Sequence, residues 1–384
     1  MKVAIVGGGP AGLYFGYLLK RKRPDAEIRL VEQNTSDATF GFGVVFSDRA
    51  LEFLRDDDPE TYAHVTPHME VWDDLTVDHD GEQVRIDGIG FAAIGRLELL
   101  KLLQERVRSV GLEPEFATQV VSFDDLAGYD LVVGADGINS VVRTGRSREF
   151  GVSVTPRRNK FVWYGTTKPF DTLTHTYRRS DHGPFNAHHY RYAPDRSTFI
   201  VETDPETWEK AGFADMDEAG TMAYCERVFA AELDGHPLVS NKSIWRNFPN
   251  VWNDAWSAGN AVLLGDALRT AHFSIGSGTR LAMEDAIALS DALVERPGDL
   301  GEALKLYEAR RRPIVEKLVA AANASAAWYE RFPEHMELTP WDLAHSYMRR
   351  TGRVSDERLT ELAPRFMAAY AERRAGTGTM KEDR

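Results

Sequence analysis

The chain has 384 residues, of which 43% are hydrophobic and 27% charged, and its formal net charge at pH 7 is −13. This composition is ordinary for a globular protein and supplies enough apolar residues for one large domain or two packed ones. The negative charge argues against a nucleic-acid partner, which needs a clustered basic face. No segment reads as a membrane span, and the single cysteine, Cys225, excludes an internal disulfide and fits a reducing, cytoplasmic compartment.

The first predicted element is a βαβ unit with a glycine pattern. An apolar run at residues 3–6 predicts a buried parallel strand, which leads into Gly7, Gly9 and Gly12 in G-x-G-x-x-G spacing. Gly7 permits a tight turn, Gly9 lets the backbone approach a pyrophosphate, and Gly12 allows close packing of helix on strand. A second strand ends in Glu32, twenty residues after Gly12, whose carboxylate can accept hydrogen bonds from a ribose. The unit predicts binding of an ADP-containing dinucleotide.

In the middle of the chain the sequence pattern changes from alternating strands and helices to mainly β-strands. Residues 69–89 alternate around an Asp80-Gly81 turn and predict a hairpin, and residues 96–110 have the period of an amphipathic helix. A short buried strand follows at 131–133. From 161 to 203 the chain is rich in β patterns, which predicts an inserted antiparallel sheet.

The C-terminal third returns to the α/β pattern. A buried strand at 261–264 precedes a long helix that begins near Thr279. Beyond residue 300 the sequence predicts several helices, broken at prolines, which lack the N–H that continues a helix. These prolines are Pro313, Pro333, Pro340 and Pro364.

Two further motifs turn a dinucleotide site into a flavin site. Asp136 and Gly137 directly follow the strand at 131–133, and Asp266 follows the strand at 261–264, where its carboxylate can bind ribityl or ribose hydroxyls. Gly276 and Gly278 then open a helix whose N-terminus can neutralise negative charge on a reduced flavin ring. The chain has only one such glycine fingerprint, so the sequence predicts a single dedicated dinucleotide-binding unit.

In this order, the three motifs resemble those of the aromatic-hydroxylating flavoprotein monooxygenases of the p-hydroxybenzoate hydroxylase type, over residues 1–328. The resemblance implies FAD as cofactor, NADH or NADPH as donor, dioxygen as co-substrate and hydroxylation through a flavin hydroperoxide. It implies that FAD is held by Gly7, Gly9, Pro10, Ala11, Gly12, Glu32, Arg96, Val120, Asp136, Gly137, Asp266, Gly276, Gly278 and Thr279.

The fold expected from these patterns is α/β. A discontinuous, three-layer Rossmann-like FAD-binding domain takes residues 1–70, 92–155 and 252–300. An antiparallel-sheet substrate domain takes 71–91 and 156–251, and C-terminal helices take 301–384.

One departure from the family text narrows the resemblance. Residues 268–273 (LRTAHF) lack the prolines that usually follow the Gly-Asp-Ala motif. Together with residues 40–48, 159–171 and 197–208, this variant is similar to a group that includes salicylyl-CoA 5-hydroxylases, the N-terminal half of anthraniloyl-CoA monooxygenase and the violacein-pathway indole hydroxylase. The similarity to the salicylyl-CoA enzymes is greatest over residues 271–289. The resemblance implies 5-hydroxylation of an aryl-CoA thioester such as salicylyl-CoA. A free aromatic or indole substrate is the alternative within this chemistry, and a non-catalytic flavin-binding redox sensor is the alternative outside it.

Candidate catalytic and substrate residues lie mainly in the β-rich middle. On the strand around 188–190, alternation sends His188 and Tyr190 to one face and His189 to the other, and either of the first two can take a phenol proton or hold a hydroxyl. Core packing is the alternative role for each. The predicted catalytic residues are His272, beside the flavin motif, His188 and Tyr190. The predicted substrate contacts are Phe46, Trp163, Tyr164, His188 and Phe273. No metal site is expected, and a monomer or homodimer is expected.

Overall fold

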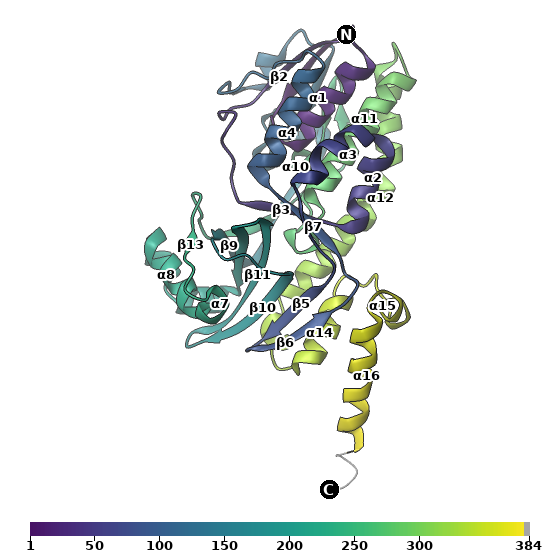
Figure 1. Cartoon of the computed structure of the whole chain (residues 1–384). Coiled ribbons are helices and arrows are strands. Elements are labelled where there is room, and N and C mark those ends of the chain that lie inside the picture. Colours follow the sequence, from purple (N-terminus) through teal and green to yellow (C-terminus); the bar gives the residue numbers. More distant parts are fainter. Residues whose placement is uncertain (380–384) are drawn as a thin grey trace.

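The computed structural model describes residues 1–379 and places the βαβ unit inside a five-stranded sheet (Figure 1). Four strands of this sheet are parallel, and the edge strand β15 is antiparallel to its neighbour. The order is β15 (Ser257–Ala258), β16 (Ala261–Leu263), β8 (Leu131–Gly134), β1 (Lys2–Val6) and β2 (Glu27–Val31). The parallel strands are apolar and mostly buried, as expected for a sheet covered by helices.

Four helices form a layer with this sheet in the upper part of Figure 1. They are α1 (Pro10–Lys22), α4 (Arg96–Ser109), α11 (Gly278–Glu295) and α12 (Leu300–Tyr329). Helix α1 contacts both α4 and α11, and α12 packs on α11. In α4, Leu99, Leu103 and Val107 are buried at helical spacing, which confirms the predicted amphipathic helix.

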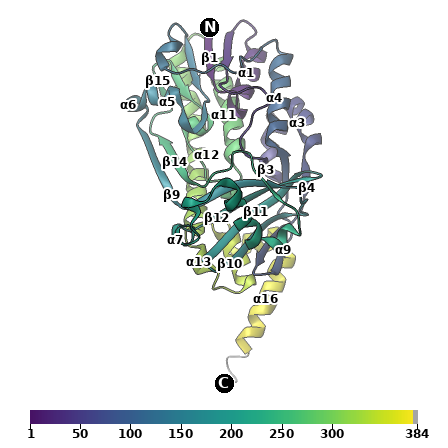
Figure 2. The same cartoon turned by 90° about the vertical axis from the view of Figure 1, so that its left-hand side faces the viewer.

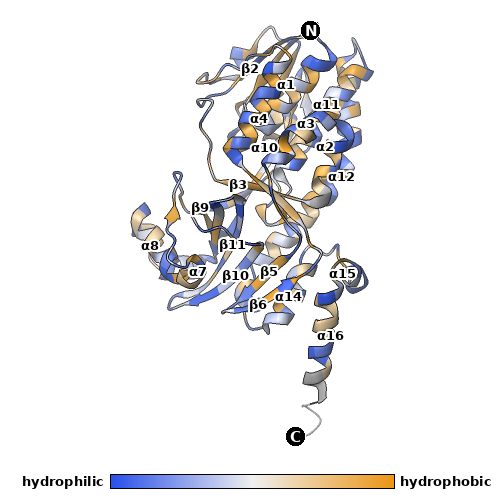
Figure 3. Cartoon of the chain, in the orientation of Figure 1, coloured by the Kyte–Doolittle hydropathy of each residue, from blue (hydrophilic) through white to orange (hydrophobic). Residues whose placement is uncertain are grey.

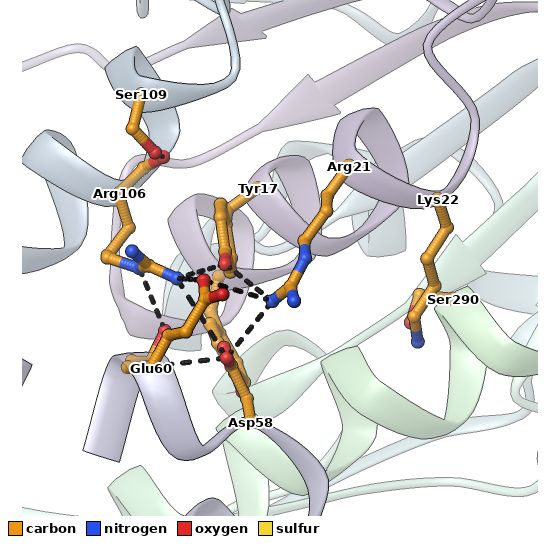
Figure 4. Close-up of polar contacts among 10 residues, drawn as sticks. Tyr17, Arg21, Lys22, Asp58, Glu60, Arg106, Ser109 and Ser290 are labelled. Carbon is orange, nitrogen blue, oxygen red and sulfur yellow. Dashed lines mark hydrogen bonds and ion pairs between the residues drawn. The ribbon is translucent and has the colours of Figure 1, made fainter. Parts of the chain in front are cut away.

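A polar network closes the outer side of this helical layer (Figure 4). Asp58, which precedes α3 (Pro59–Val65), pairs with Arg21 of α1 at 3.2 Å, and Glu60 pairs with Arg106 of α4 at 2.9 Å. The Tyr17 hydroxyl accepts hydrogen bonds from both arginines. Each charge in the network therefore has a partner of opposite sign, and the network joins three helices.

The second sheet has eight strands, and its predicted antiparallel character is confirmed except that β10 and β5 run parallel. Its order is β13 (Leu238–Val239), β9 (Val152–Thr166), β12 (Arg196–Thr203), β11 (Gly183–Ala193), β10 (Leu173–Ser180), β5 (Leu75–His79) and β6 (Glu82–Ile86), with β14 (Arg246–Asn253) also paired to β9. The predicted hairpin is β5–β6, with Asp80 and Gly81 at φ of 48° and 97° in its turn. Figure 2 shows β9 and β14 running from the upper part of the molecule to the lower.

Helices cover both faces of this sheet. The face on one side packs against α7 (Pro205–Lys210), α8 (Glu218–Val228) and α9 (Ala230–Leu233), and the other faces α12, α13 (Phe332–His335) and α14 (Pro340–Arg349). The strands carry polar residues that are nevertheless buried, among them His175, His188 and Glu202. Figure 3 accordingly colours β10 hydrophilic. Burying polar side chains costs free energy unless they form hydrogen bonds, so their presence in this sheet indicates a role besides packing, such as binding a ligand.

A small third sheet connects the two large ones. Its order is β3 (Gly43–Ser47), β7 (Phe91–Gly95) and β4 (Glu70–Trp72). The short helices α2 (Glu52–Asp57) and α3 follow β3, α5 (Val141–Gly145) and α6 (Ser147–Phe150) follow β8, and α10 (Gly265–Leu268) follows β16.

The predicted helix break at Pro313 is wrong. Helix α12 continues through this proline, which removes one backbone hydrogen bond from the helix. Two residues earlier, Arg311 forms ion pairs with Glu284 and Asp285 of α11, and these contacts hold that part of α12 against its neighbour. Pro333, Pro340 and Pro364 lie in the first turns of α13, α14 and α16 (Pro364–Thr379), where the missing N–H costs nothing.

The C-terminus is helical, as predicted. Helix α15 (Asp356–Leu362) precedes α16, which projects away from the body of the molecule in Figures 1 and 2. Residues 380–384 of the predicted C-terminal segment lie outside the described residues. The domain division stays a prediction; its five boundaries (70/71, 91/92, 155/156, 251/252 and 300/301) all fall inside elements, namely β4, β7, β9, β14 and α12. Within residues 1–379, no helix is both long and apolar enough to cross a bilayer.

Candidate functional site

The three predicted motifs begin at one edge of the parallel sheet. Val6 of β1 and Leu263 of β16 both align with Gly134 of β8, so the three strands end in a single row. A Cβ atom on Gly134 would lie 2.8 Å from the Leu263 side chain and 2.9 Å from that of Val142. The bare glycine therefore allows the strands and the following α5 to approach closely, and the carboxyl ends of β1, β8 and β16 open on the same side.

A cavity of about 310 Å³ lies beyond this edge. One wall consists of residues from all three motifs and the start of α4. It includes Gly9, Pro10, Ala11, Arg96, Ala135, Gly137, Gly265, Asp266, Gly276, Gly278 and Thr279. The opposite wall comes from the eight-stranded sheet and the C-terminal helices, including Trp163, His175, His188, Tyr190, Tyr347 and Arg350. The cavity thus joins the predicted cofactor site to the predicted substrate region.

The glycines of the first motif have different tasks. Gly7 has a φ of 108°, and a Cβ on Gly12 would lie 2.0 Å from the Gly7 carbonyl oxygen, so both glycines are required for the turn to fold. Around Gly9, no atom lies within 4 Å of where a Cβ would stand. Gly9 also precedes α1, whose first N–H groups have no side-chain cap. The space and the free N–H groups fit a pyrophosphate.

Glu32 connects this loop to the end of β2. Its carboxylate accepts hydrogen bonds from the Gly8 N–H at 2.7 Å and from the Asn34 N–H and side-chain amide at 2.9 and 2.7 Å. The carboxylate is therefore oriented at the strand end, where a ribose would approach in the predicted arrangement.

A buried ion-pair network holds the Gly265-Asp266 turn. Asp285 of α11 is fully buried and accepts hydrogen bonds from the Gly265 N–H at 3.2 Å and from Arg269 at 2.6 Å. Arg311 of α12 donates to the other carboxylate oxygen at 3.2 Å. Because Asp285 is paired on both sides, the turn is fixed and Asp266 is directed elsewhere.

Asp266 and Arg96 are the open charges of the motif wall. The Asp266 side chain is exposed to the cavity and forms no hydrogen bond within the described residues. Desolvation of this carboxylate by the surrounding protein raises its pKa. The Arg96 Nε is buried without a partner, and burial lowers the pKa of this guanidinium against the pull of Asp266. Groups left unpaired in this way fit the hydroxyls and polar ring atoms of FAD.

The second motif is held by its own side chains. Asp136 accepts from the Val141 and Val142 N–H groups at 2.7 and 3.3 Å, and burial raises its pKa. Arg143 donates to the Ala267 carbonyl at 3.0 Å and so links this motif to the third. Gly137, at φ 74°, faces the cavity together with Ala135 of the same loop, and no atom lies near its missing Cβ.

The N-terminus of α11 faces the same cavity. Ser277 precedes the helix without capping it through its side chain, and the first turn contains no acidic residue. Gly276 has a φ of 61°, and a Cβ atom added to it would lie 3.1 Å from the Val45 side chain. A Cβ atom added to Gly278 would have no neighbouring atom within 4 Å. These free N–H groups fit a ring that carries negative charge.

Several predicted residues do not reach the cavity. Trp163 lines it, but its neighbour Tyr164 is fully buried among α8 residues on the other face, because adjacent strand residues point in opposite directions. Phe46 likewise packs into the core of the first sheet, whereas Val45 lines the cavity. Val120 is buried in that core as well. The side chains of Tyr164, Phe46 and Val120 thus pack in the core, and their direct contacts with substrate or cofactor stay predictions.

His272 is also absent from the cavity wall. Its ring forms a hydrogen bond with the Ser274 hydroxyl at 2.8 Å, and Ser274 in turn contacts Ser325 of α12 at 2.7 Å. Burial lowers the pKa of His272 to about 3, so the ring is neutral. Its neighbour Phe273 does line the cavity, as predicted. The structure therefore shows His272 bonded within its own turn, and the catalytic role stays a prediction.

The predicted alternation on β11 is confirmed. His188 and Tyr190 face the cavity, and the Tyr190 hydroxyl donates to the Gly43 carbonyl at 2.9 Å, while His189 stacks on Phe199 on the opposite face. The His188 Nε2 lies 3.0 Å from Asn186 Oδ1, an acceptor, so Nε2 carries the proton and Nδ1 is free to accept. Burial holds the pKa of His188 well below its usual value.

Among the cavity-wall residues that the sequence analysis missed are His175, Tyr347 and Arg350. His175 of β10 aligns with His188 across the sheet, and its Nδ1 lies 3.1 Å from the Tyr329 hydroxyl and its Nε2 contacts the Tyr347 hydroxyl. Tyr347 and Arg350 come from the end of α14. The alternating pattern of β10 was the available signal for His175, but no local pattern connects α14 to this sheet.

Glu202 of β12 lies behind His188. It is fully buried, its Oε1 accepts from the Asn159 amide at 2.7 Å, and its Oε2 has no hydrogen-bond partner and is 3.9 Å from His188 Nε2. Burial raises the pKa of Glu202 to about 8. The acid is thus protonated at neutral pH. Among the described residues, no group of three or more His, Cys, Asp and Glu side chains is placed to hold a metal ion.

The chain matches a known protein family over most of its length. The model of the FAD binding domain family matches residues 1–129 and 127–322. The chain belongs to this family. That assignment confirms the predicted resemblance and FAD as the cofactor.

The chain is also similar to named monooxygenases. It is 45% identical to the salicyloyl-CoA 5-hydroxylase of a Streptomyces species, over 91% of this chain and 70% of that protein. It is 38% identical to the 3-hydroxy-4-methyl-anthranilyl-(aryl-carrier protein) 5-monooxygenase of Streptosporangium sibiricum, over 92% and 95%. It is 36% identical to the protodeoxyviolaceinate monooxygenase of Chromobacterium violaceum, over 91% and 94%.

Solved structures agree on the fold. The tetrameric form of 2-methyl-3-hydroxypyridine-5-carboxylic acid oxygenase matches 91% of this chain and 95% of its own with a TM-score of 0.72 at 18% identity. PqsL of P. aeruginosa, in complex with 2-aminobenzoylacetate, matches 86% and 97% with a TM-score of 0.68 at 25% identity.

Two glycine variants separate folding from cofactor binding. Gly9→Ala introduces a Cβ into open space at a φ of −78°, which alanine tolerates, so the apoprotein should keep its Tm while FAD affinity falls roughly tenfold or more. Gly12→Ala forces a Cβ against the Gly7 carbonyl and should lower stability by about 1–3 kcal/mol. Thermal denaturation of the apoproteins and FAD titration measure the two effects; equal loss of Tm in both variants would contradict the assignment of Gly9.

The buried carboxyl group of Glu202 should make the folding stability depend on pH. Because folded Glu202 holds its proton up to about pH 8, whereas an unfolded glutamate releases it near its ordinary pKa, folding stability should decrease as pH rises between these values. The contribution is roughly 1.4 kcal/mol for each pH unit in that interval. Glu202→Gln should remove this slope in urea unfolding from pH 5 to 8, and Glu209→Gln, at an exposed position, should not. Identical slopes in wild type and Glu202→Gln would show that the acid is not held protonated.

Proposed function

We propose that this protein hydroxylates salicylyl-CoA at the ring 5-position, with NADH or NADPH as electron donor and dioxygen as the oxygen source. FAD-dependent hydroxylation of an aromatic ring is the function of the relatives with which it shares its family. The observation that carries the proposal is that one cavity has the three flavin motifs on one wall and histidine and aromatic side chains on the other. A flavin and an aromatic ring can therefore lie face to face there.

Residues of the motif wall would hold the FAD cofactor. When bound, FAD supplies the transfer of electrons from the nicotinamide to dioxygen. Gly9, Gly137 and Gly278 leave space for it, while Arg96 and Asp266 orient it through polar contacts. This assignment of roles is part of the proposal.

The opposite wall receives the substrate. Trp163, Phe248 and Phe273 give it apolar surface that excludes water, and water would otherwise divert the oxidation to hydrogen peroxide. His188 Nδ1, held unprotonated by the bond from Nε2 to Asn186, accepts a hydrogen bond from a ring hydroxyl. Such a bond raises the electron density of the ring.

Two observations favour a thioester over a free aromatic. The first two relatives are named for an acyl-CoA and for a carrier-protein substrate, both of which are thioester-linked aryl groups. In addition, Arg96 lines a second, more open hollow of about 420 Å³ next to the cavity, with room for an extended substituent. The relative that acts on protodeoxyviolaceinate supports the free-aromatic alternative, at lower identity.

Turnover with a matched set of substrates tests the proposal. Salicylyl-CoA should accelerate NAD(P)H oxidation and give hydroxylated product with little peroxide, whereas salicylate, anthraniloyl-CoA and a tryptophan-derived indole should be poorer in rate or coupling. Preference for the indole would favour the alternative substrate. Absence of any aromatic-stimulated NAD(P)H oxidation would indicate a flavin-binding sensor and contradict the proposal.

A further inference from the structure

The charges of the cavity wall are unevenly balanced. Among the described lining residues, the side chains with a full charge at neutral pH are Arg96, Asp266 and Arg350. Arg96 and Asp266 attract each other across the motif wall. Arg350 takes part in no ion pair within residues 1–379 that the structure describes. The opposite wall therefore carries an uncompensated positive charge.

Neutral acceptors hold Arg350 in place. Its Nε donates to the Ser325 hydroxyl at 3.0 Å, and its two terminal nitrogens donate to the carbonyls of Tyr347 and Ser274 at 2.8 and 2.9 Å. The guanidinium carbon lies 3.7 Å from the centre of the Tyr347 ring. A guanidinium has five N–H donors, so one on each terminal nitrogen is left for a ligand. The side chain is thus rigid and preorganised for a planar anionic group.

The neighbouring titratable groups do not neutralise this charge. They are His175 and Tyr177 of β10, His188 of β11, His272 before the Phe273–Ile275 turn, Tyr329 of α12 and Tyr347 of α14. Burial lowers the pKa of each histidine and raises the pKa of each tyrosine, so all are neutral near pH 7. Glu202, behind His188, is protonated below about pH 8 because burial raises its pKa.

We propose that Arg350 binds an anionic oxygen of the aromatic substrate and thereby selects aryl thioesters that carry an ionisable ring hydroxyl. The inference rests on the proposed function, because the hydroxyl is that of the salicylyl group. On binding, the ring hydroxyl that first donates to His188 Nδ1 is ionised: the O–H bond breaks heterolytically, the proton passes to the bulk solvent outside the cavity, and the electron pair stays on the oxygen that Arg350 then holds. This pair is delocalised into the ring and enriches the carbon para to the oxygen, which is the 5-position of a salicylyl group.

Arg350 lies outside the segments that match the family model, which end at residue 322. The motifs common to the family therefore do not determine this contact. It comes from the C-terminal helices, which bring α14 against the eight-stranded sheet. Substrate selection by this residue is thus separable from cofactor binding.

Equilibrium binding to the oxidised, FAD-loaded protein tests the inference without turnover. The dissociation constants of salicylyl-CoA and of benzoyl-CoA, which lacks the hydroxyl, are measured from flavin absorbance at pH 6 to 7.5. Arg350→Met should weaken salicylyl-CoA roughly ten- to hundred-fold and affect benzoyl-CoA little, and Arg350→Lys should recover part of the loss. Arg353→Met, at an exposed arginine three residues later, should bind both ligands as wild type does.

Proton release provides a readout that a purely structural role would not change. In weakly buffered solution at pH 7, wild type should release protons on binding salicylyl-CoA and none on binding benzoyl-CoA, and Arg350→Met should release fewer. Equal weakening of both thioesters, or no proton release by wild type with salicylyl-CoA, would overturn the inference even if Arg350→Met folded poorly.

A second ligand pair separates this inference from the proposed function. If wild type binds neither thioester, the proposed substrate is wrong, and 2-hydroxyacetophenone and acetophenone then probe Arg350 as a hydroxyl-bearing pair and its matched control. Selective loss of the hydroxylated ketone in Arg350→Met would support oxyanion binding, and equal binding of the two ketones in wild type would contradict it.

Discussion

The site depends on the register of three parallel strands. Val6, Gly134 and Leu263 stand in one row across β1, β8 and β16, and the chain leaves each strand directly after this row. Motifs separated by more than a hundred residues in the sequence are therefore brought to one edge. A shift of one residue in either pairing would turn the side chains to the opposite face and separate the motifs. The strand ends, more than any single side chain, define where the flavin lies.

Charges at this edge fall into two kinds. Asp285 is buried and fully paired, to Arg269 and Arg311, and removal of one partner of such a pair typically costs about 3–5 kcal/mol because a buried charge is left alone. Asp266 and Arg96 are left open on the cavity side of the same turn. The paired groups fix the backbone, and the unpaired groups are available to ligands. Arg350 is arranged similarly on the opposite wall, where neutral hydrogen-bond acceptors position the guanidinium without neutralising its charge.

Much of the first wall could be predicted from sequence because its signals are local. A glycine pattern directly after an apolar run specifies both the turn and its position on the strand, and Gly9, Gly137, Asp266 and Gly278 all reach the cavity. The opposite wall depends on long-range pairing. His175 faces the cavity only because β10 aligns with β11, and Arg350 only because α14 returns to this sheet. No window of sequence contains that information.

Where the structure departs from the local sequence pattern, the causes are equally specific. Trp163 and Tyr164 are adjacent on a strand, so at most one of them can face the cavity. His272 is close to the flavin motif in sequence, but its ring turns back to Ser274. Pro313 is a helix breaker by propensity, yet the ion pairs of Arg311 hold α12 in place. In each case tertiary contacts decided what local propensity left open.

The central claim, that three converging motifs bind one flavin, is tested most directly by titrating the apoprotein with FAD and following flavin fluorescence. Wild type should bind one FAD per chain and become yellow. Asp266→Ala, which removes an open carboxylate from the cavity, should weaken binding by roughly tenfold or more, and Asp215→Ala, an exposed acid remote from the motifs in sequence, should not. Wild-type protein that stays colourless with added FAD, or an Asp266→Ala variant with unchanged affinity, would contradict the account.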